Sequence, residues 1–366
     1  MKKFILTILT VFLTLPIFAE ETKIAEETNI LPSETGIVES VQYVDTNDEI
    51  VQTKQAVKVR LASGEFKGET VDLENILTGN PYYDIKLKKG IRVLLHAEDN
   101  GNGVEFSIED VKRAGTLTWL SLIFCGLLLY VGKKKGLYSL ISIALTVLLI
   151  THCLSPIILL GVNPILATII ICVISTLATM YLVGGFNAKS TSASIGAVLS
   201  LLFASILSGI TMITAHLTGF SGENSMFLYS AHPELNFISL TIATMVLATL
   251  GAVMDVAMSI SSTINEIYET DNTKTINELF QSGMNVGRDI IGTMANTLIL
   301  VYLGASLPLV LLAGNIDLQK FINLNQVVTE IASALIGSIA IVICVPFTAL
   351  VASMLIHKSN KRELEK

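Results

Sequence analysis

Residues 251–266 read GAVMDVAMSISSTINE, an apolar helical pattern that runs directly into carboxylates. At a helical pitch, small and acidic residues share one stripe, and the large apolar residues point elsewhere. The stripe comprises Gly251, Asp255, Ser259, Ser262 and Glu266, and the residues pointing elsewhere are Val253, Val256, Ile260 and Ile264. A charge in or near a bilayer core is costly unless it is paired or hydrated. Asp255 is therefore the first candidate for a functional residue.

The composition is that of a membrane protein. Of the 366 residues, 51% are hydrophobic and 15% are charged, and the mean hydropathy is +0.65, which is high for a soluble domain. Residues 20–113 hold 19 acidic and 11 basic side chains, so the acidic excess behind the net charge of −7 belongs to this segment. That balance argues against a nucleic-acid partner, because phosphate binding needs a basic patch.

The N-terminus resembles an export signal. Residues 1–3 are positively charged, residues 4–18 are apolar, and Ala19 precedes two glutamates. Because Ile17 occupies the −3 position, both a cleaved signal peptide over residues 1–19 and an uncleaved anchor remain open, and either places the following segment outside the cytoplasm. Residues 20–35 are rich in Glu and Thr and predict a flexible spacer.

Residues 36–113 predict a small extracytoplasmic all-β domain. Apolar and polar residues alternate around Val57 and Val59, and turn residues occur at 63–64 and 99–103. Further strands are expected at 66–73, within 85–96 and at 104–108. Five or six short strands favour a small antiparallel barrel or an OB-like fold.

The remaining chain predicts an α-helical integral membrane bundle of about seven transmembrane helices, with a cytoplasmic tail over residues 357–366. Each apolar segment between residues 116 and 356 is near the length that crosses a ~30 Å hydrocarbon layer. The predicted spans are 116–132, 137–156, 164–184, 193–215, 236–258, 290–312 and 328–356.

Basic residues favour one orientation of these spans. An exported N-terminal domain places Lys133 to Lys135, Lys189, Lys274 and the basic tail in the cytoplasm, and leaves only Lys320 in a short outer loop. We therefore expect a multi-pass protein of the cytoplasmic membrane, with the N-terminal domain outside and the C-terminus inside.

A second polar segment, GRDIIGTMANT at residues 287–297, begins the sixth span. Arg288 enters the membrane at a depth comparable to that at which Asp255 leaves it, which predicts an ion pair between them. In the alternative, Arg288 and Asp289 only snorkel at the interface. The predicted path for an ion, proton or substrate comprises Asp255, Ser259, Ser262, Glu266, Arg288, Asp289 and Asn296.

Between these two spans, Ile276, Leu279, Phe280 and Met284 recur at helical spacing. They predict an amphipathic helix over residues 275–288 on the cytoplasmic surface. Such a helix is either an interfacial strut or a docking site for a cytoplasmic partner.

The sequence offers no basis for an enzyme or a cofactor. It contains no His-Glu-x-x-His pair, no Gly-x-Gly-Asp, no Gly-x-Ser-x-Gly and no Walker A motif. His216, Glu223, His232 and Glu234 lie in one outer loop, but their wide spacing favours a solvated loop over a metal site. The cysteines, which lie in apolar runs and predict no disulfide, are Cys125, Cys153, Cys172 and Cys344.

Residues 251–266, together with 282–300 (SGMNVGRDIIGTMANTLIL) and 304–308 (GASLP), resemble the signature region of the YibE/F-like family of bacterial multi-pass membrane proteins. The resemblance extends more loosely over residues 116–356. It implies a membrane protein of a kind often described as permease-like, without an established substrate or catalytic residue. No functional residue can therefore be transferred from the family.

Two functional hypotheses follow from these patterns. In the first, the protein is a permease-like transporter of an unidentified solute or ion, whose polar path passes Asp255. In the second, it is a non-transporting scaffold or sensor, whose outer domain binds an envelope protein and whose amphipathic inner helix passes the signal. The sequence leaves the substrate, its direction, the energy source and the oligomeric state open.

Overall fold

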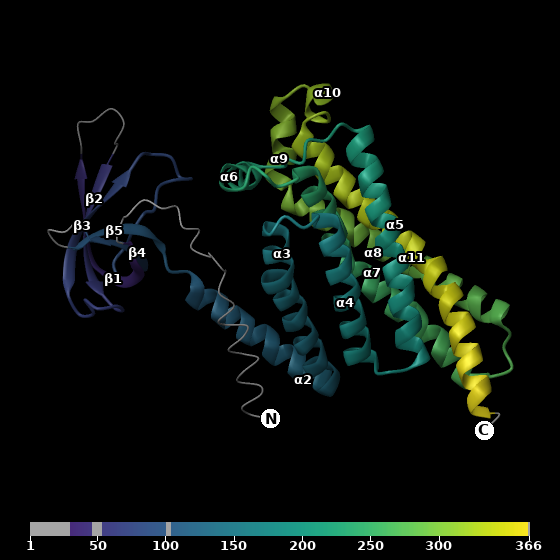
Figure 1. The fold of residues 1–366 in the computed structure, drawn as a ribbon. Helices are drawn as coiled ribbons and strands as arrows, with labels where there is room; N and C mark the ends of the chain where they lie inside the picture. The colour runs from purple at the N-terminus through teal and green to yellow at the C-terminus, as the bar shows by residue number, and fades with distance from the viewer. Residues whose placement is uncertain (1–29, 46–52, 100–103, 365–366) are drawn as a thin grey trace. The chain divides into compact units, whose positions relative to one another are not determined.

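The computed structural model describes residues 30–45, 53–99 and 104–364 (Figure 1). The predicted signal peptide and residues 20–29 of the predicted spacer lie outside the described residues. The chain forms two compact units, which divide after Leu127.

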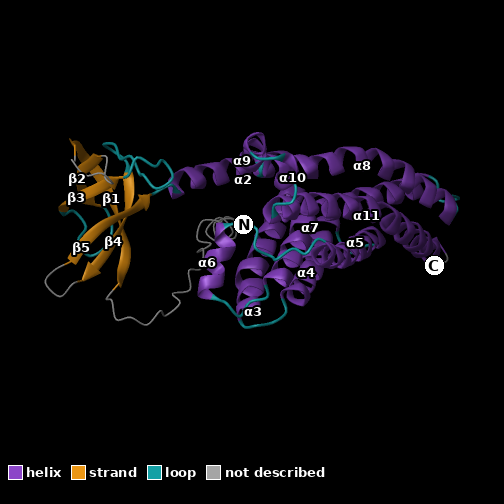
Figure 2. Cartoon of the chain, turned by 90° about the horizontal axis from the view of Figure 1, so that it is seen from above, coloured by secondary structure: helices purple, strands orange, loops and turns teal. Residues whose placement is uncertain are grey.

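The N-terminal unit contains a five-stranded antiparallel sheet (Figure 2). Its strands are β1 (Ile30–Asp45), β2 (Thr53–Leu61), β3 (Thr70–Leu77), β4 (Arg92–Asp99) and β5 (Val104–Val111). They are ordered β3-β2-β1-β4-β5. The long strand β1 pairs with β2 through its second half and with β4 through its first half. Strands β3 and β5, at the two ends of this order, also approach one another, so the sheet curls.

The core of this sheet comes from the alternation seen in the sequence. Val57, Val59 and Leu61 on β2 are each at most 2% exposed, and polar residues between them face outward. Two predicted boundaries were wrong. Strand β1 already begins at Ile30, within the predicted spacer, because its first half pairs with β4. Strand β3 begins at Thr70, because residues 63–68 form turns.

The second unit contains long helices joined by short connections. Its elements, with the preceding part of α2, are α2 (Ala114–Leu148), the π-helix η1 (Leu149–Leu154), α3 (Ser155–Leu159), α4 (Pro164–Gly184), α5 (Ala188–Thr214), α6 (Glu223–Ala231), α7 (Phe237–Thr270), α8 (Ile276–Ala305), α9 (Leu307–Leu312), the 3-10 helix η2 (Ala313–Asn315), α10 (Leu318–Phe321) and α11 (Asn325–Leu364). Among the described residues, six helices are long and apolar enough to cross a membrane.

The first of these six, Ala114–Leu159, contains both the first and the second predicted spans. It is broken at Lys133, where φ is 47° and ψ is −124°. A Cβ atom added at Gly136 would lie 2.1 Å from the carbonyl oxygen of Leu128. Eight residues of continuous helix would separate these positions by about 12 Å. The chain therefore reverses here, and this one long helix accounts for two of the seven predicted spans.

Helices α5, α7 and α11 form the centre of the second unit, with α4 packed on α5 and α7, and α8 packed on α11 and α7 (Figures 1 and 2). Glycine allows the closest approaches. A Cβ atom at Gly196 would lie 2.1 Å from Thr348 Oγ1, and one at Gly287 would lie 2.1 Å from Val345 Cγ1. Small residues thus set the spacing of α5 and α8 against α11.

Candidate functional site

The two faces of α7 divide as the sequence predicted. Val253, Val256, Ile260 and Ile264 are fully buried in the helical core. On the polar stripe, Gly251, Asp255, Ser259 and Glu266 are exposed in the isolated chain, and Ser262 is half-buried. The stripe is therefore a surface of α7 that the central helices leave free.

Asp255 borders a cavity of about 460 Å³ between α2, α4 and α7. This volume falls within the range of small-ligand pockets, roughly 300–1,000 Å³. Its lining residues are Ser139, Ser142, Ile143, Thr146, Val147, Thr179, Met180, Val183, Gly251, Met254, Asp255 and Met258. Asp255 is the one ionisable residue in this lining, and the other polar groups are hydroxyls. Within the described residues, its carboxylate has no hydrogen bond or ion pair.

The hydroxyl groups of this cavity were not part of the predicted site. Ser142 Oγ lies 2.5 Å from Thr179 Oγ1, and one turn further along, Thr146 Oγ1 lies 2.8 Å from Ser175 Oγ. The sequence does contain a pattern that places these hydroxyls on one helical face, since Ser139, Ser142 and Thr146 recur at steps of three and four. Hydroxyls in spans often only bond their own helix, so that spacing alone could not reveal the pairing of α2 with α4.

A contact between α5 and α7 fixes the depth of Asp255. Ser261 Oγ donates to the backbone oxygen of Lys189 at 2.7 Å, so these residues lie at the same level. Lys189 is one of the residues predicted to mark the cytoplasmic boundary. Asp255 precedes Ser261 by six residues, which corresponds to about 9 Å along the helix. Its side chain therefore lies inside the predicted boundary.

The predicted ion pair between Asp255 and Arg288 was wrong. Arg288 Nη1 donates instead to Asn285 Oδ1, one turn back on α8, at 3.0 Å. Helix α8 turns its glycines toward the bundle, with Gly283 against Ile264 and Gly287 against Val345. Arg288 follows Gly287 by about 100° around the helix and points outward, whereas Asp255 lies in the cavity with α2 and α4.

Asp289 and Asn296 are also exposed, on the outer face of α8. Neither lines the cavity that contains Asp255. The structure therefore separates the seven predicted site residues into two groups. On α7, Asp255 lines the cavity and Ser259, Ser262 and Glu266 do not. The group on α8 lies on a different surface.

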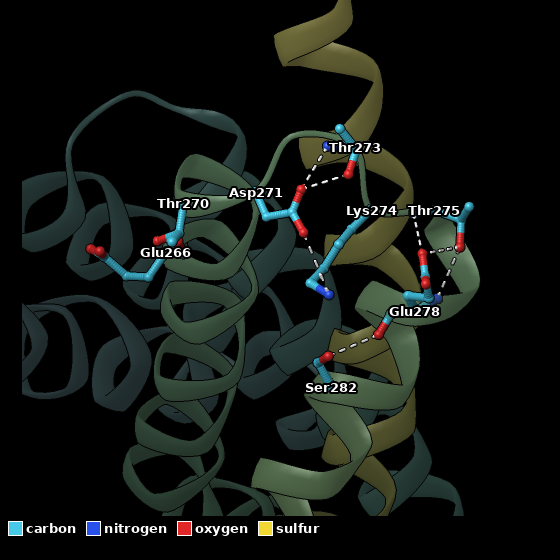
Figure 3. A network of polar contacts seen from close by, with 8 residues as sticks. All are labelled: Glu266, Thr270, Asp271, Thr273, Lys274, Thr275, Glu278 and Ser282. Atoms are coloured by element: carbon cyan, nitrogen blue, oxygen red, sulfur yellow. Dashed lines mark hydrogen bonds and ion pairs between the residues drawn. The ribbon is translucent and has the colours of Figure 1, made fainter.

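Glu266 lies near the end of α7, beside the turn into α8 (Figure 3). Its backbone oxygen accepts from Thr270 Oγ1 at 2.8 Å, and its carboxylate points away from the polar network of the turn. In that network, Thr273 donates twice to Asp271, from its backbone nitrogen at 3.2 Å and its hydroxyl at 2.6 Å. These bonds, led by the one from the hydroxyl, lower the pKa of Asp271.

The segment predicted as a separate amphipathic helix is the beginning of α8. Thr275 and Glu278 form a capping box that starts this helix, which then continues without a break to Ala305 (Figure 3). Most of its apolar residues pack against the bundle. Leu279 is fully buried, and Phe280 and Met284 pack against the core, while Ile276 is 40% exposed. A cytoplasmic partner at this segment stays a prediction, but most of the apolar face is already occupied.

On the other side of the unit, the predicted outer loop forms α6 and the turn that follows it. His232 Nδ1 lies 3.1 Å from Glu234 Oε1. This contact joins two neighbouring residues of the loop, and neither belongs to the cavity of Asp255.

Comparison with protein families decides the identity of the chain. Residues 120–358 match the model of the YibE/F-like protein family, and residues 30–111 match the YibE/F family N-terminal domain. The chain belongs to the YibE/F-like family. Comparisons with curated proteins and with solved structures found no match. The family match and the apolar helices together make this YibE/F-like chain a membrane protein.

The two family matches correspond to the two parts of the structure. The YibE/F N-terminal domain match covers the sheet from β1 to the end of β5. The YibE/F-like match covers most of the helical region, including both the Asp255 cavity and the outer face of α8. The resemblance noted in residues 251–308 is thus confirmed over nearly the whole chain.

Proposed function

We propose that this YibE/F-like protein transports a small cation, a proton included, across the cytoplasmic membrane, with Asp255 as the charged ligand. The observation that carries this proposal is the position of Asp255. Its carboxylate borders a cavity of about 460 Å³, inside the level of Lys189, without a cationic partner among the described residues. An intramembrane carboxylate in this position marks an ion or proton site by default.

The lining of the cavity supports a cation over an anion. It combines one carboxylate with the hydroxyls of Ser139, Ser142, Thr146 and Thr179, and it contains no Lys, Arg or His. Oxygen ligands suit hard cations and protons. An anion would face the negative charge without a compensating group.

A flux assay tests the role of Asp255. Purified protein in liposomes would be assayed with fluorescent reporters of H⁺, Na⁺ and K⁺. We expect Asp255→Asn to abolish flux and Asp255→Glu to retain part of it, because the glutamate keeps the charge. Glu266→Gln is the matched control on the same stripe of α7, and we expect it to keep most of the activity, because Glu266 does not line the cavity.

Thiol labelling tests whether water reaches the cavity, independently of the transported ion. In a cysteine-free background, Asp255→Cys is expected to react with a membrane-impermeant thiol reagent. Val253→Cys should not react, because Val253 is fully buried on the opposite face of the helix. An unreactive Cys at position 255, or flux that survives in Asp255→Asn, would contradict the proposal. Absence of any flux with a partner captured by the β-domain would favour the scaffold hypothesis.

A further inference from the structure

The outer face of α8 carries polar side chains deep into the predicted membrane. Gln281, Asn285, Arg288, Asp289 and Asn296 are all exposed. Gly292 lies among them, and a Cβ atom added there would meet nothing within 4 Å. The face is therefore open in the single chain.

Contacts between the helices show how deep this face reaches. A Cβ atom at Gly337 would approach both Leu298, at 2.5 Å, and Thr249, at 3.3 Å, so these two residues lie at the same level. Helices α7 and α8 run in opposite directions, which places Asn296 level with Gly251. Gly251 precedes Ser261 by ten residues, so Asn296 lies about 15 Å inside the level of Lys189. In a hydrocarbon layer of about 30 Å, this is near the middle.

An amide near the middle of a bilayer requires a partner. The side chain of Asn296 has no hydrogen bond among the described residues, and a polar group left in hydrocarbon is costly. Lipid headgroups do not reach this depth.

The geometry points to a second copy of this chain as the partner, joined through a parallel contact between the two α8 helices. Copies inserted in the same orientation are related by an axis normal to the membrane, which places identical residues at identical depths. Asn296 then faces Asn296 of the other copy and can exchange amide hydrogen bonds with it. Gly292, one turn earlier on the same line, permits close approach of the two backbones.

The charges of this face are self-complementary under the same symmetry. Arg288 and Asp289 lie on opposite sides of the line through Gly292 and Asn296, because consecutive residues are about 100° apart around a helix. A two-fold axis brings Arg288 of one copy beside Asp289 of the other, and repeats this pair on the opposite side. The contact therefore contains two reciprocal ion pairs. Its existence does not depend on the transport role of Asp255.

Disulfide crosslinking in native membranes tests the contact. In a cysteine-free background, Asn296→Cys is expected to form a covalent dimer on oxidation. The matched control is Leu199→Cys on α5, which is 39% exposed. Leu199 follows Lys189 by ten residues and so lies at the same depth as Asn296, but on a helix that does not pack on α8. No dimer at position 296, or equal yields at both positions, would overturn the inference.

Charge exchange tests the ion pairs separately. Introduced beside Asn296→Cys, Arg288→Asp or Asp289→Arg alone creates like-charge neighbours and is expected to lower the crosslinked fraction severalfold. The double exchange restores opposite charges and should restore the yield. If Arg288 and Asp289 only snorkel, the crosslinked fraction should be equal in the Asn296→Cys protein, the two single exchanges and the double exchange. That result would overturn the ion pairs even if the crosslink at position 296 forms.

Discussion

Helices α7 and α8 both carry polar side chains inside the level of Lys189, Asp255 by about 9 Å and Asn296 by about 15 Å, but the chain covers them differently. Asp255 on α7 lies in a cavity whose other walls, α2 and α4, supply hydroxyl groups. Asn296 on α8 lies on an open face with no partner among the described residues. A polar residue of the first kind can serve a ligand, whereas one of the second kind needs another protein surface. Depth and residue type alone do not distinguish the two roles.

The cause of this difference is the way in which each helix packs. On α7, Val253, Val256 and Ile260 belong to the buried helical core, and Gly251 and Asp255 of the polar stripe line the cavity with α2 and α4. On α8, Gly283 and Gly287 face the bundle and point the polar residues away from it. Each helix has one covered and one free face, and only α7 has neighbouring helices that enclose part of its free face.

Glycine substitutions on the two faces of α8 should change the stability of the protein more than the other substitutions considered below. Gly287→Ala adds a Cβ atom 2.1 Å from Val345 Cγ1, and overpacking of this kind costs about 1–3 kcal/mol. Gly292→Ala meets nothing within 4 Å and should stabilise the helix by up to about 1 kcal/mol. Thermal unfolding of the monomeric protein in detergent should show opposite shifts in Tm.

If both glycine variants lower Tm equally, α8 has no free face in the single chain. That result would mean that the face containing Gly292 is covered within a single chain. The crosslinked dimer would then need another surface.

Much of the fold could be predicted from the sequence, because the spacing of apolar residues along the chain indicates which faces of strands and helices are buried. The alternation at Val57 and Val59 predicted β2, and apolar segments predicted the long helices. The continuation of α8 through residues 276–289 was missed, because its polar residues suggested a segment outside the membrane. In the structure the polar residues of this segment belong to α8, and Leu279, which lies among them, is buried against the bundle.

The candidate site was predictable only in part. Helical spacing correctly separated the polar and buried faces of α7, so Asp255 was placed on a free surface. Spacing could not show which helix lies opposite, because that depends on contacts between residues far apart in the chain. The pair of Ser142 with Thr179 and the outward direction of Arg288 both required the packed structure.

A double-mutant cycle measures how strongly the two cavity walls on α2 and α4 are coupled. Ser142→Ala and Thr179→Val each remove one partner of the hydroxyl contact between α2 and α4. We expect a coupling energy of about 0.6 kcal/mol, the typical size for such bonds inside membranes. Unfolding equilibria in mixed micelles measure it. The control cycle combines Ser142→Ala with Thr297→Val on α8, because the Thr297 hydroxyl bonds its own helix at Thr293. An equal coupling energy in the control cycle would show that the Ser142–Thr179 contact does not contribute.

The smallest effect is expected at the turn that joins the two compared helices. The hydroxyl and amide of Thr273 hold the pKa of Asp271 below its ordinary value. A carboxyl whose pKa is lower in the folded state contributes stability above its unfolded pKa, and loses it as the pH falls through the folded pKa. Thr273→Val removes the hydrogen bond from the hydroxyl to Asp271 and should raise this pKa toward the ordinary value. Titration of ¹³C-labelled aspartate in micelles, assigned with Asp271→Asn, measures the change. An unchanged pKa in Thr273→Val would show that this hydroxyl does not hold the carboxylate at the turn between α7 and α8.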